Sequence, residues 1–336
     1  MVSSPPPRTF TLASRASQLA QIQTNITRAA LETATADAAV SQPKFATSFM
    51  STAGDRNQTQ ALYTLNSAEG KAFWTKDLEV ALLDKSVDML VHSFKDVPTT
   101  LPDGCVIGAV LEREDPVDSF VVKKGKEWKR LEDLAEGSVV GTSSVRRIAQ
   151  LKRRFPGLKF MDCRGNLNTR LSKLDADDSP YAALILAKSG MVRNGMGDRL
   201  TSDIHPPTLF HAVSQGALAV EVRADDAEAL ALCKLITHRP TLLRCTAERA
   251  CLRVLEGGCS VPVGVQTALT EDGELEMTAC VTGLDGKEHV QHTLKRKVES
   301  EQDAQKVGAE IAKLLVDSGA AKILQTIKED REKRTA

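Results

Sequence analysis

This chain of 336 residues has little of what marks several common classes of protein. No apolar run approaches the ~20 residues of a membrane-spanning helix, and the Ser/Pro-rich start of the chain lacks the apolar core of a secretion signal. Lys plus Arg and Asp plus Glu both number 44, so the basic excess of most proteins that bind long nucleic acids is missing. We therefore expect a cytoplasmic protein that binds neither membranes nor nucleic acids.

The spacing of the cysteines and the absence of several well-known sequence motifs argue against some common kinds of site and enzyme. The seven cysteines are odd in number and no pair has CxxC spacing, which argues against a disulfide framework or a zinc site. The sequence has no Walker phosphate loop, GxGxxG fingerprint, GxSxG elbow or HExxH motif. The sequence therefore lacks the motifs that are typical of kinases, dehydrogenases, serine hydrolases and zinc proteases. We also expect no metal site.

The pattern of hydrophobic residues predicts three domains. The length exceeds what one core usually serves, and the pattern changes near Asp118 and near Pro240. Before Pro240, strand-like and helical runs alternate, which favours mostly parallel sheets with helices on both faces. After it, alternating strands lead to an amphipathic helix at 302–317 and a charged tail at 328–333, which favours a smaller α+β domain. The strands are predicted at 10–13, 45–50, 88–92, 119–122, 139–141, 159–163, 181–187, 261–267 and 275–282, and the helices from about 17 and at 76–84, 145–154, 166–174 and 247–255.

Arginines cluster at two junctions where a predicted strand leads into a predicted helix, at 141–147 and 163–170. Ser143 or Ser144 can cap the first helix, and Arg146 and Arg147 fall in its first turn, where cations oppose the helix dipole. The arrangement makes sense if a carboxylate or phosphate sits over the free N–H groups and the arginines close on it. The alternative is that these arginines are ordinary solvated surface charges. We favour it less, because the same arrangement occurs at two junctions.

Asp96 lies just past a predicted buried strand, between Lys95 and a turn that ends in proline. A carboxylate flanked by cations in a cleft stays ionised and can stabilise a developing positive charge. An aspartate that only accepts hydrogen bonds from the turn's own backbone is an equally good interpretation. His92, at the strand's end, is expected to be structural rather than a metal ligand.

Cys259 follows two glycines, so its thiol is expected in an open, exposed loop. Such a thiol can be a nucleophile, an attachment point or incidental. A cysteine protease would need a positioned histidine, and the surroundings of His92 and His211 carry no such signature. We favour attachment, because the loop fits beside an anion-binding cleft.

Taken together, these segments resemble the hydroxymethylbilane synthase (porphobilinogen deaminase) family. The resemblance runs from about Phe10 to Pro262 and is weaker beyond. The segments that match in order and spacing are 13–20 with Gln23, 71–79, 92–98, 141–147, 164–171, 215–218 and 256–262.

The resemblance implies two periplasmic-binding-protein-like α/β domains and a smaller C-terminal α+β domain. We place them at 1–113 with a return segment at 216–236, at 117–212, and at 240–336. It also implies a transferase of tetrapyrrole (haem) biosynthesis, expected to act as a monomer. Such an enzyme condenses four porphobilinogens head to tail onto a dipyrromethane, releases ammonia each time, and hydrolyses off linear hydroxymethylbilane.

The resemblance also assigns residues by position. Asp96 matches the catalytic aspartate, and Cys259 matches the cysteine that holds the dipyrromethane by a thioether. Cofactor binding falls to Lys95, Ser143, Ser144, Arg146, Arg147 and Arg170, and substrate binding to Arg15, Ser17, Gln23, Lys71, Arg164, Arg193 and Gln215. Because each pyrrole carries an acetate and a propionate, a growing chain needs such an arginine cluster to offset its charge.

The alternative from another class is a non-enzymatic, two-lobed anion-binding protein. It explains the arginines but gives Asp96 and Cys259 no role.

Overall fold

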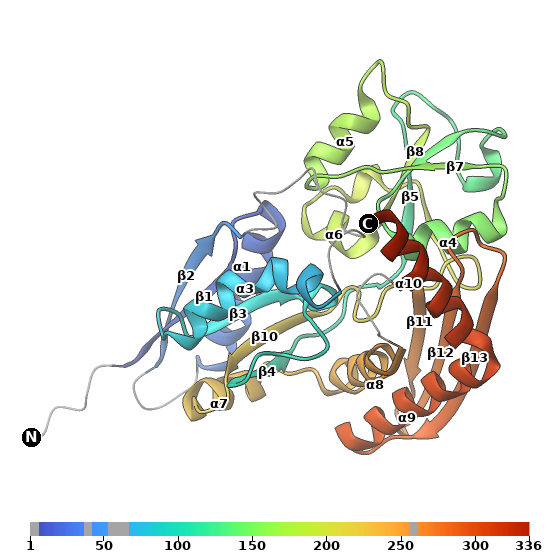
Figure 1. The fold of residues 1–336 in the computed structure, drawn as a ribbon. Helices are drawn as coiled ribbons and strands as arrows, with labels where there is room; N and C mark the ends of the chain where they lie inside the picture. Colours follow the sequence, from blue (N-terminus) through green and yellow to red (C-terminus); the bar gives the residue numbers. More distant parts are fainter. Residues whose placement is uncertain (1–6, 37–41, 53–66, 256–260, 336) are drawn as a thin grey trace, which may run out of the picture. The chain divides into compact units, whose positions relative to one another are not determined.

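The computed structural model describes residues 7–36, 42–52, 67–255 and 261–335. The chain divides into two compact units: unit 1 comprises residues 1–57, 71–113 and 217–242, and unit 2 comprises 58–70, 114–216 and 243–336. Figure 1 shows their helices and strands. Within the described residues, no helix combines the length and apolar character needed to cross a bilayer.

Unit 1 is a five-stranded sheet in the order β2-β1-β3-β10-β4. Its strands are β1 (Thr9–Arg15), β2 (Lys44–Met50), β3 (Met89–Ser93), β4 (Cys105–Val110) and β10 (Leu218–Arg223). Strand β1 is parallel to β2 and β3, whereas β10 runs antiparallel to both β3 and β4. The sheet is therefore mixed, and the prediction of mostly parallel strands holds for only part of it.

Helices cover both faces of this sheet because side chains alternate along its strands. Phe10 and Leu12 of β1 pack with Leu31 of α1 (Gln18–Ala34) and Cys233 of α7 (Ala227–Leu235). On the other face, Ala13 and its neighbours pack against α3 (Ser67–Leu83). Ser17 begins α1 as its N-cap, its hydroxyl accepting from the Ala20 N–H at 3.4 Å.

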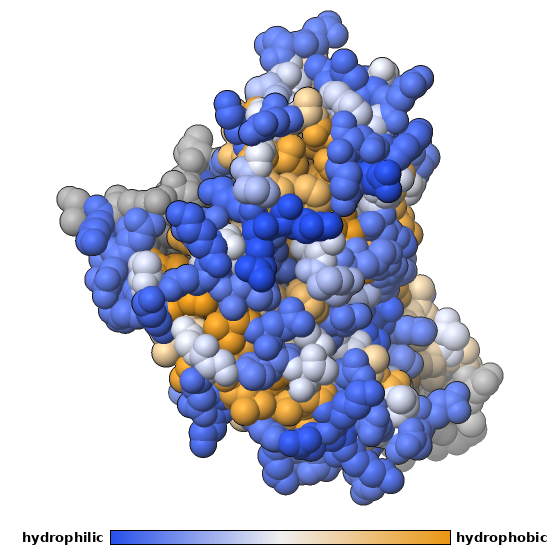
Figure 2. Space-filling model, turned by 90° about the vertical axis from the view of Figure 1, so that its right-hand side faces the viewer, coloured by the Kyte–Doolittle hydropathy of each residue, from blue (hydrophilic) through white to orange (hydrophobic). Residues whose placement is uncertain are grey.

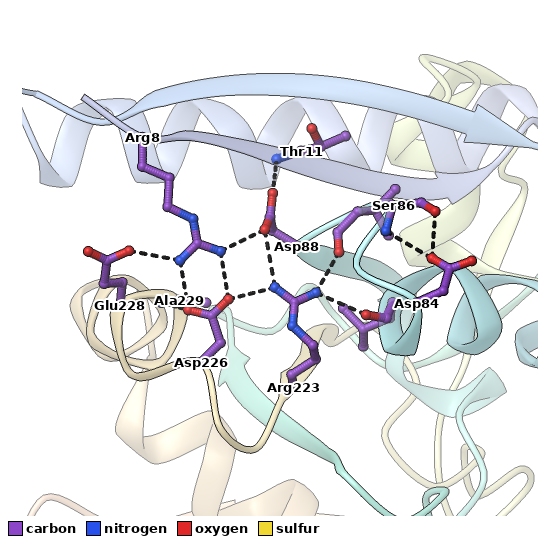
Figure 3. Close-up of polar contacts among 11 residues, drawn as sticks. Arg8, Thr11, Asp84, Ser86, Asp88, Arg223, Asp226, Glu228 and Ala229 are labelled. Atoms are coloured by element: carbon purple, nitrogen blue, oxygen red, sulfur yellow. Dashed lines mark hydrogen bonds and ion pairs between the residues drawn. The ribbon is translucent and has the colours of Figure 1, made fainter. Parts of the chain in front are cut away.

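An ion-pair network ties unit 1 together where β1 and β3 begin (Figure 3). The Arg8 guanidinium donates to Asp88, Asp226 and Glu228 at 2.7–3.0 Å. Arg223, at the end of β10, donates to Asp88 at 3.2 Å and to Asp226 at 2.7 Å. These contacts join three segments that are far apart in sequence.

Unit 2 contains a second five-stranded sheet, in the order β7-β6-β8-β5-β9. Its strands are β5 (Asp118–Val122), β6 (Val139–Gly141), β7 (Lys159–Met161), β8 (Ala183–Ala187) and β9 (Ser202–Ile204). In each sheet three neighbouring strands are parallel, β2-β1-β3 or β7-β6-β8, and the next strand, β10 or β5, runs antiparallel to both of its neighbours. The predicted pair of α/β domains is confirmed.

Helices also cover both faces of the second sheet. Helix α4 (Val145–Arg154) packs on one face through Leu151, while α5 (Leu167–Asp175) and α6 (Lys188–Arg193) pack on the other through Leu174 and Met191. Both β6 and α4 lie where the sequence predicted them.

The C-terminal part of unit 2 is the smaller α+β part that the sequence predicted. Antiparallel strands β11 (Val263–Leu269), β12 (Glu274–Thr282) and β13 (His289–Lys297) share a core with α8 (Arg239–Leu255), α9 (Glu301–Leu315) and α10 (Ala321–Thr335). The charged residues at 328–333, predicted as a tail, belong to α10. On the face drawn in Figure 2, hydrophilic residues predominate and hydrophobic residues show between them in groups.

Candidate active site

The predicted catalytic residue Asp96 lines a small pocket in unit 1. It ends a short 3-10 turn, Phe94–Asp96, that follows β3 directly. Buried Phe94 anchors this turn, and its N–H donates to the Ala217 carbonyl at 3.0 Å. The turn closes with a bond from the Val97 N–H to the Phe94 carbonyl. Asp96 is one of the residues that line a pocket of about 60 Å³.

Three predicted substrate-binding residues line the same pocket: Arg15, Ser17 and Gln23. They converge because β1 and β3 are parallel, so their carboxyl ends lie at one edge of the sheet. The Gln23 amide and the Ser93 hydroxyl exchange hydrogen bonds of 2.9 and 3.0 Å. This pair fixes α1 against the end of β3. Asp96 and these three residues therefore line one pocket.

Other predicted residues of this region are placed less directly. Lys95 is partly buried and is not part of the pocket lining. The backbone of Lys71 belongs to α3, but its side chain lies outside the described residues. Cys259 also lies outside them, so the expectation of an exposed loop thiol stays a prediction.

A buried acidic cluster that the sequence did not reveal lies behind the pocket. His92 lines the pocket, and its Nε2 is 3.0 Å from Oε2 of Glu221, which is fully buried. Glu79 of α3 is also buried. Burial raises the pKa of Glu79, and the negative charge of Glu221 raises it further, while Thr75 and His92 act in the opposite direction. The structural role expected of His92 agrees with this pairing.

Arg146 and Arg147 open α4 in unit 2, as predicted, but they are buried and contact a carboxylate of the chain itself. Arg146 Nη1 donates to Asp118 at 2.7 Å, and Arg147 donates to it through Nε at 3.1 Å and Nη2 at 2.7 Å. The position of these arginines in the first turn of a helix predicted an external anion here. The structure instead places Asp118 beside the arginines, so their position alone no longer requires a ligand at this helix.

The two arginine-bearing junctions are neighbours. Ser144 is the N-cap of α4, and the Ser143 hydroxyl donates to the Cys163 carbonyl at 3.1 Å, at the second junction. Arg170 of α5 donates only to the Gly165 carbonyl among the described residues. Burial lowers the pKa of Arg170, and the positive charges of Arg147 and Arg164 lower it further. The two junctions thus form one electropositive region.

Arg193 and Gln215 complete the set assigned to unit 2. Arg193 Nη2 donates to the Gly216 carbonyl at 2.8 Å, and burial lowers its pKa. Gln215 is buried, and its amide donates to the Pro116 carbonyl at 2.6 Å and to Asp118 at 3.0 Å. Arg164 is partly buried. The Asp96 pocket thus belongs to unit 1, and the arginine cluster to unit 2.

Comparison with known proteins gives a consistent answer over nearly the whole chain. Residues 10–231 match the family model "Porphobilinogen deaminase, dipyromethane cofactor binding domain", and residues 242–317 match "Porphobilinogen deaminase, C-terminal domain". The porphobilinogen deaminase of Yarrowia lipolytica is 46% identical over 96% of this chain and 94% of its own length. That of Synechococcus elongatus is 47% identical over 97% and 98%.

The chain belongs to the porphobilinogen deaminase family. As a member, it is a transferase of tetrapyrrole biosynthesis with a dipyrromethane cofactor, and the non-enzymatic anion-binding alternative is not favoured. Among solved structures, the periplasmic aliphatic sulphonate binding protein of Escherichia coli covers 74% of the chain at 11% identity with a TM-score of 0.36. A likeness of that size supports no conclusion.

Proposed function

We propose that this member of the porphobilinogen deaminase family uses Asp96 for catalysis and the arginines of unit 2 to bind carboxylates. The observation that carries the proposal is the surplus of positive charge within the arginine cluster of unit 2. Among the described residues, Arg170 and Arg193 donate to carbonyl groups, and Arg146 and Arg147 share one carboxylate. Dipyrromethane and the pyrroles added to it carry acetate and propionate groups, which fit this surplus.

The cofactor-side residues are Lys95, Ser143, Ser144, Arg146, Arg147 and Arg170, with Cys259 as the attachment point. The cofactor supplies the pyrrole to which substrate is joined. The guanidinium groups hold carboxylates in charge-assisted hydrogen bonds, which are stronger than neutral ones. The serines fix the helix mouth from which the arginines project.

Cys259 is the favoured attachment point partly because of the other cysteines. All six lie buried. Burial raises the pKa of Cys105, Cys233 and Cys280 to about 12. Since the thiolate is the nucleophile, these thiols are poorly reactive at neutral pH.

The substrate-side residues are Arg15, Ser17, Gln23, Lys71, Arg164, Arg193 and Gln215. Arg15, Ser17 and Gln23 line the pocket that contains Asp96, so a substrate bound there brings its nitrogen atoms close to this carboxylate. Loss of ammonia leaves positive charge on the pyrrole, and a fixed carboxylate stabilises that charge. Repeating this step joins four porphobilinogens, and hydrolysis then releases hydroxymethylbilane.

The attachment is tested by Cys259→Ser. We expect a folded protein whose intact mass equals that of the sequence, whereas the parent mass is larger by a dipyrromethane. The control is Cys163→Ser, which alters a buried thiol beside the arginine cluster and is expected to keep the adduct. An adduct on Cys259→Ser that is lost from Cys163→Ser would move the attachment to Cys163.

The remaining features of the enzyme are also proposals. We propose a cytoplasmic monomer that binds no nucleic acid, supported by equal numbers of basic and acidic residues. The domain limits 1–113 with 216–236, 117–212 and 240–336 are supported by the division of the strands into three separate sheets.

A further inference from the structure

Asp118, the first residue of β5, accepts hydrogen bonds from three buried side chains. Its Oδ2 accepts from Arg146, and its Oδ1 accepts from Arg147 and Gln215, at 2.7–3.1 Å. Its side chain has no exposed surface. Burial alone would raise the pKa of Asp118, but the charges of Arg146 and Arg147 and these hydrogen bonds hold it below its usual range. Asp118 is therefore ionised at neutral pH.

The charges around Asp118 do not balance. Among the described residues, Asp118 is the only carboxylate in contact with either Arg146 or Arg147, so two guanidinium ions share one negative charge. Burial of an uncompensated ion is costly. Here the remaining positive charge lies close to Arg170, because the charge of Arg147 lowers the pKa of Arg170.

Asp118 also fixes where that remaining charge lies. Arg147 meets it through both Nε and Nη2, a two-pronged contact that sets the plane of the guanidinium. Arg147 Nη1 donates to the Ile185 carbonyl, and Arg146 Nη1 also donates to the Phe210 carbonyl, both at 2.7 Å. Both side chains are thus held in place without any ligand.

We propose that Asp118 is a positioning residue for the cofactor-binding arginines: it holds Arg146 and Arg147 in place and neutralises only part of their charge, so that the carboxylates of dipyrromethane supply the rest. This inference rests on the proposed role of the two arginines in holding the cofactor. A purely structural Asp118 would contribute equally to the cofactor-free and cofactor-bound protein. A positioning Asp118 matters more to the cofactor-free protein, because bound carboxylates partly replace its charge.

The test compares Asp118→Asn with the parent, each made in cells that supply porphobilinogen and in cells that cannot make it. Intact mass shows which preparations carry dipyrromethane, so a failure of the proposed cofactor is detected separately. We expect the difference in Tm between cofactor-bound and cofactor-free protein to be larger in Asp118→Asn by roughly 3 °C or more. Equal differences in variant and parent would overturn the proposal.

Acetate is a second probe that needs no cofactor. At equal ionic strength and neutral pH, sodium acetate in place of sodium chloride is expected to raise the Tm of cofactor-free Asp118→Asn but not that of the parent. Asp118→Glu, which keeps the charge, is expected to show no acetate response. An acetate response as small in Asp118→Asn as in the parent would count against the proposal.

The matched control is Asp175→Asn in the same unit. Asp175 also makes a two-pronged ion pair with an arginine, Arg199, at 2.7 and 3.0 Å, but among the described residues neither contacts the arginine cluster. Its loss should lower the Tm of both forms equally, without an acetate response. If Asp118→Asn yields no folded cofactor-free protein, the double variant with Arg146→Gln restores the parent's charge and is expected to fold. Failure of that double variant to fold would show that Asp118 does not act by offsetting the charge of Arg146 and Arg147.

Discussion

At the scale of single residues, Asp96 owes its place to the residues around it. Phe94 anchors the turn in the core, the Gln23–Ser93 pair holds α1 against β3, and Asp96 lines the pocket at the end of this turn. A carboxylate fixed in this way needs no rearrangement when positive charge develops, which is the condition for electrostatic stabilisation of a transition state.

Asp96→Asn removes this charge and keeps the size of the side chain. We expect turnover to fall by about 10²–10³-fold or more, because removal of a preorganised electrostatic group has this effect, while folding and substrate binding persist. The measurement is ammonia release and bilane formation by protein with the cofactor already attached. Asp103→Asn, at an exposed position, is the control. Turnover of Asp96→Asn within a few-fold of the parent would show that Asp96 is a structural turn residue.

The family resemblance assigned Arg15, Ser17, Gln23 and Asp96 by position, but nothing in the sequence pointed to Asp118. In the structure, residues 15–23 and 92–96 follow strands that are parallel neighbours, so they lie at one edge of the sheet. Asp118 reaches Arg146 across 28 residues, at the start of a strand that local patterns could not orient. The position of Arg146 and Arg147 in the first turn of a helix indicated a nearby anion. It did not indicate whether that anion is a ligand or a carboxylate of the chain.

At the scale of elements, α4 and α5 share one arrangement. Each follows a short strand, β6 or β7, and these strands are parallel neighbours, so both helices begin at the same edge of the sheet. The bond from the Ser143 hydroxyl to the Cys163 carbonyl joins the two junctions. Carboxylates of a growing chain can therefore meet arginines from both helices.

The arginines are expected to fail in two distinguishable ways. Substitution of Arg146, Arg147 or Arg170 should impair cofactor assembly, whereas substitution of Arg164 or Arg193 should leave cofactor-bound enzyme that stalls with partial chains. A charge-assisted contact contributes about 1.5–3 kcal/mol, enough to lower occupancy by an order of magnitude. Mass spectra of each variant after incubation with porphobilinogen give the test. The same ladder of adducts in both groups would contradict the division.

Some elements were predicted well, whereas the strands β4, β10 and β13 were missed. Helix α4 and strand β6 lie where the sequence placed them. Strand β13 was missed because polar and charged residues fill it and one side is exposed to solvent. Strand β10 contains buried Glu221, whose Oε2 lies 3.0 Å from Nε2 of His92. This partner comes from another strand and cannot be seen in the local sequence.

At the scale of the whole molecule, unit 1 has its pocket and its ion-pair network at opposite ends of β1. Arg8 precedes this strand, whereas Arg15 ends it and lines the pocket. Asp226 is central to the network (Figure 3). Its hydrogen bond with Arg8 is the main reason that its pKa falls to about 2, against the opposing effect of burial.

Stability is therefore expected to depend on Asp226 in a defined range of pH. Because its pKa is lowered in the folded state, its contribution is present above the unfolded pKa of roughly 4 and is lost as pH falls toward about 2. Asp226→Asn should lower the free energy of unfolding at pH 7 by on the order of 2 kcal/mol, with only a small difference from the parent near pH 2. The asparagine oxygen can still cap α7, so the change removes the negative charge and one acceptor for the arginines but keeps the helix cap.

Urea unfolding at a series of pH values measures this effect. Asp272→Asn, at an exposed turn, serves as the control and should change little at any pH. A deficit in Asp226→Asn that is the same at pH 7 and near pH 2 would show that the carboxylate charge is not its cause.

The order of strands in unit 1 has a consequence for synthesis on the ribosome. A nascent chain that ends at Gly216 contains every strand of the first sheet except β10, which lies between β3 and β4. Until β10 emerges, β4 has no partner in its sheet and β3 keeps one open edge. All strands of the second sheet, β5 to β9, have been translated by then. Domains usually fold in the order in which they are made. Here, however, the first sheet can be completed only after all strands of the second sheet have been synthesised.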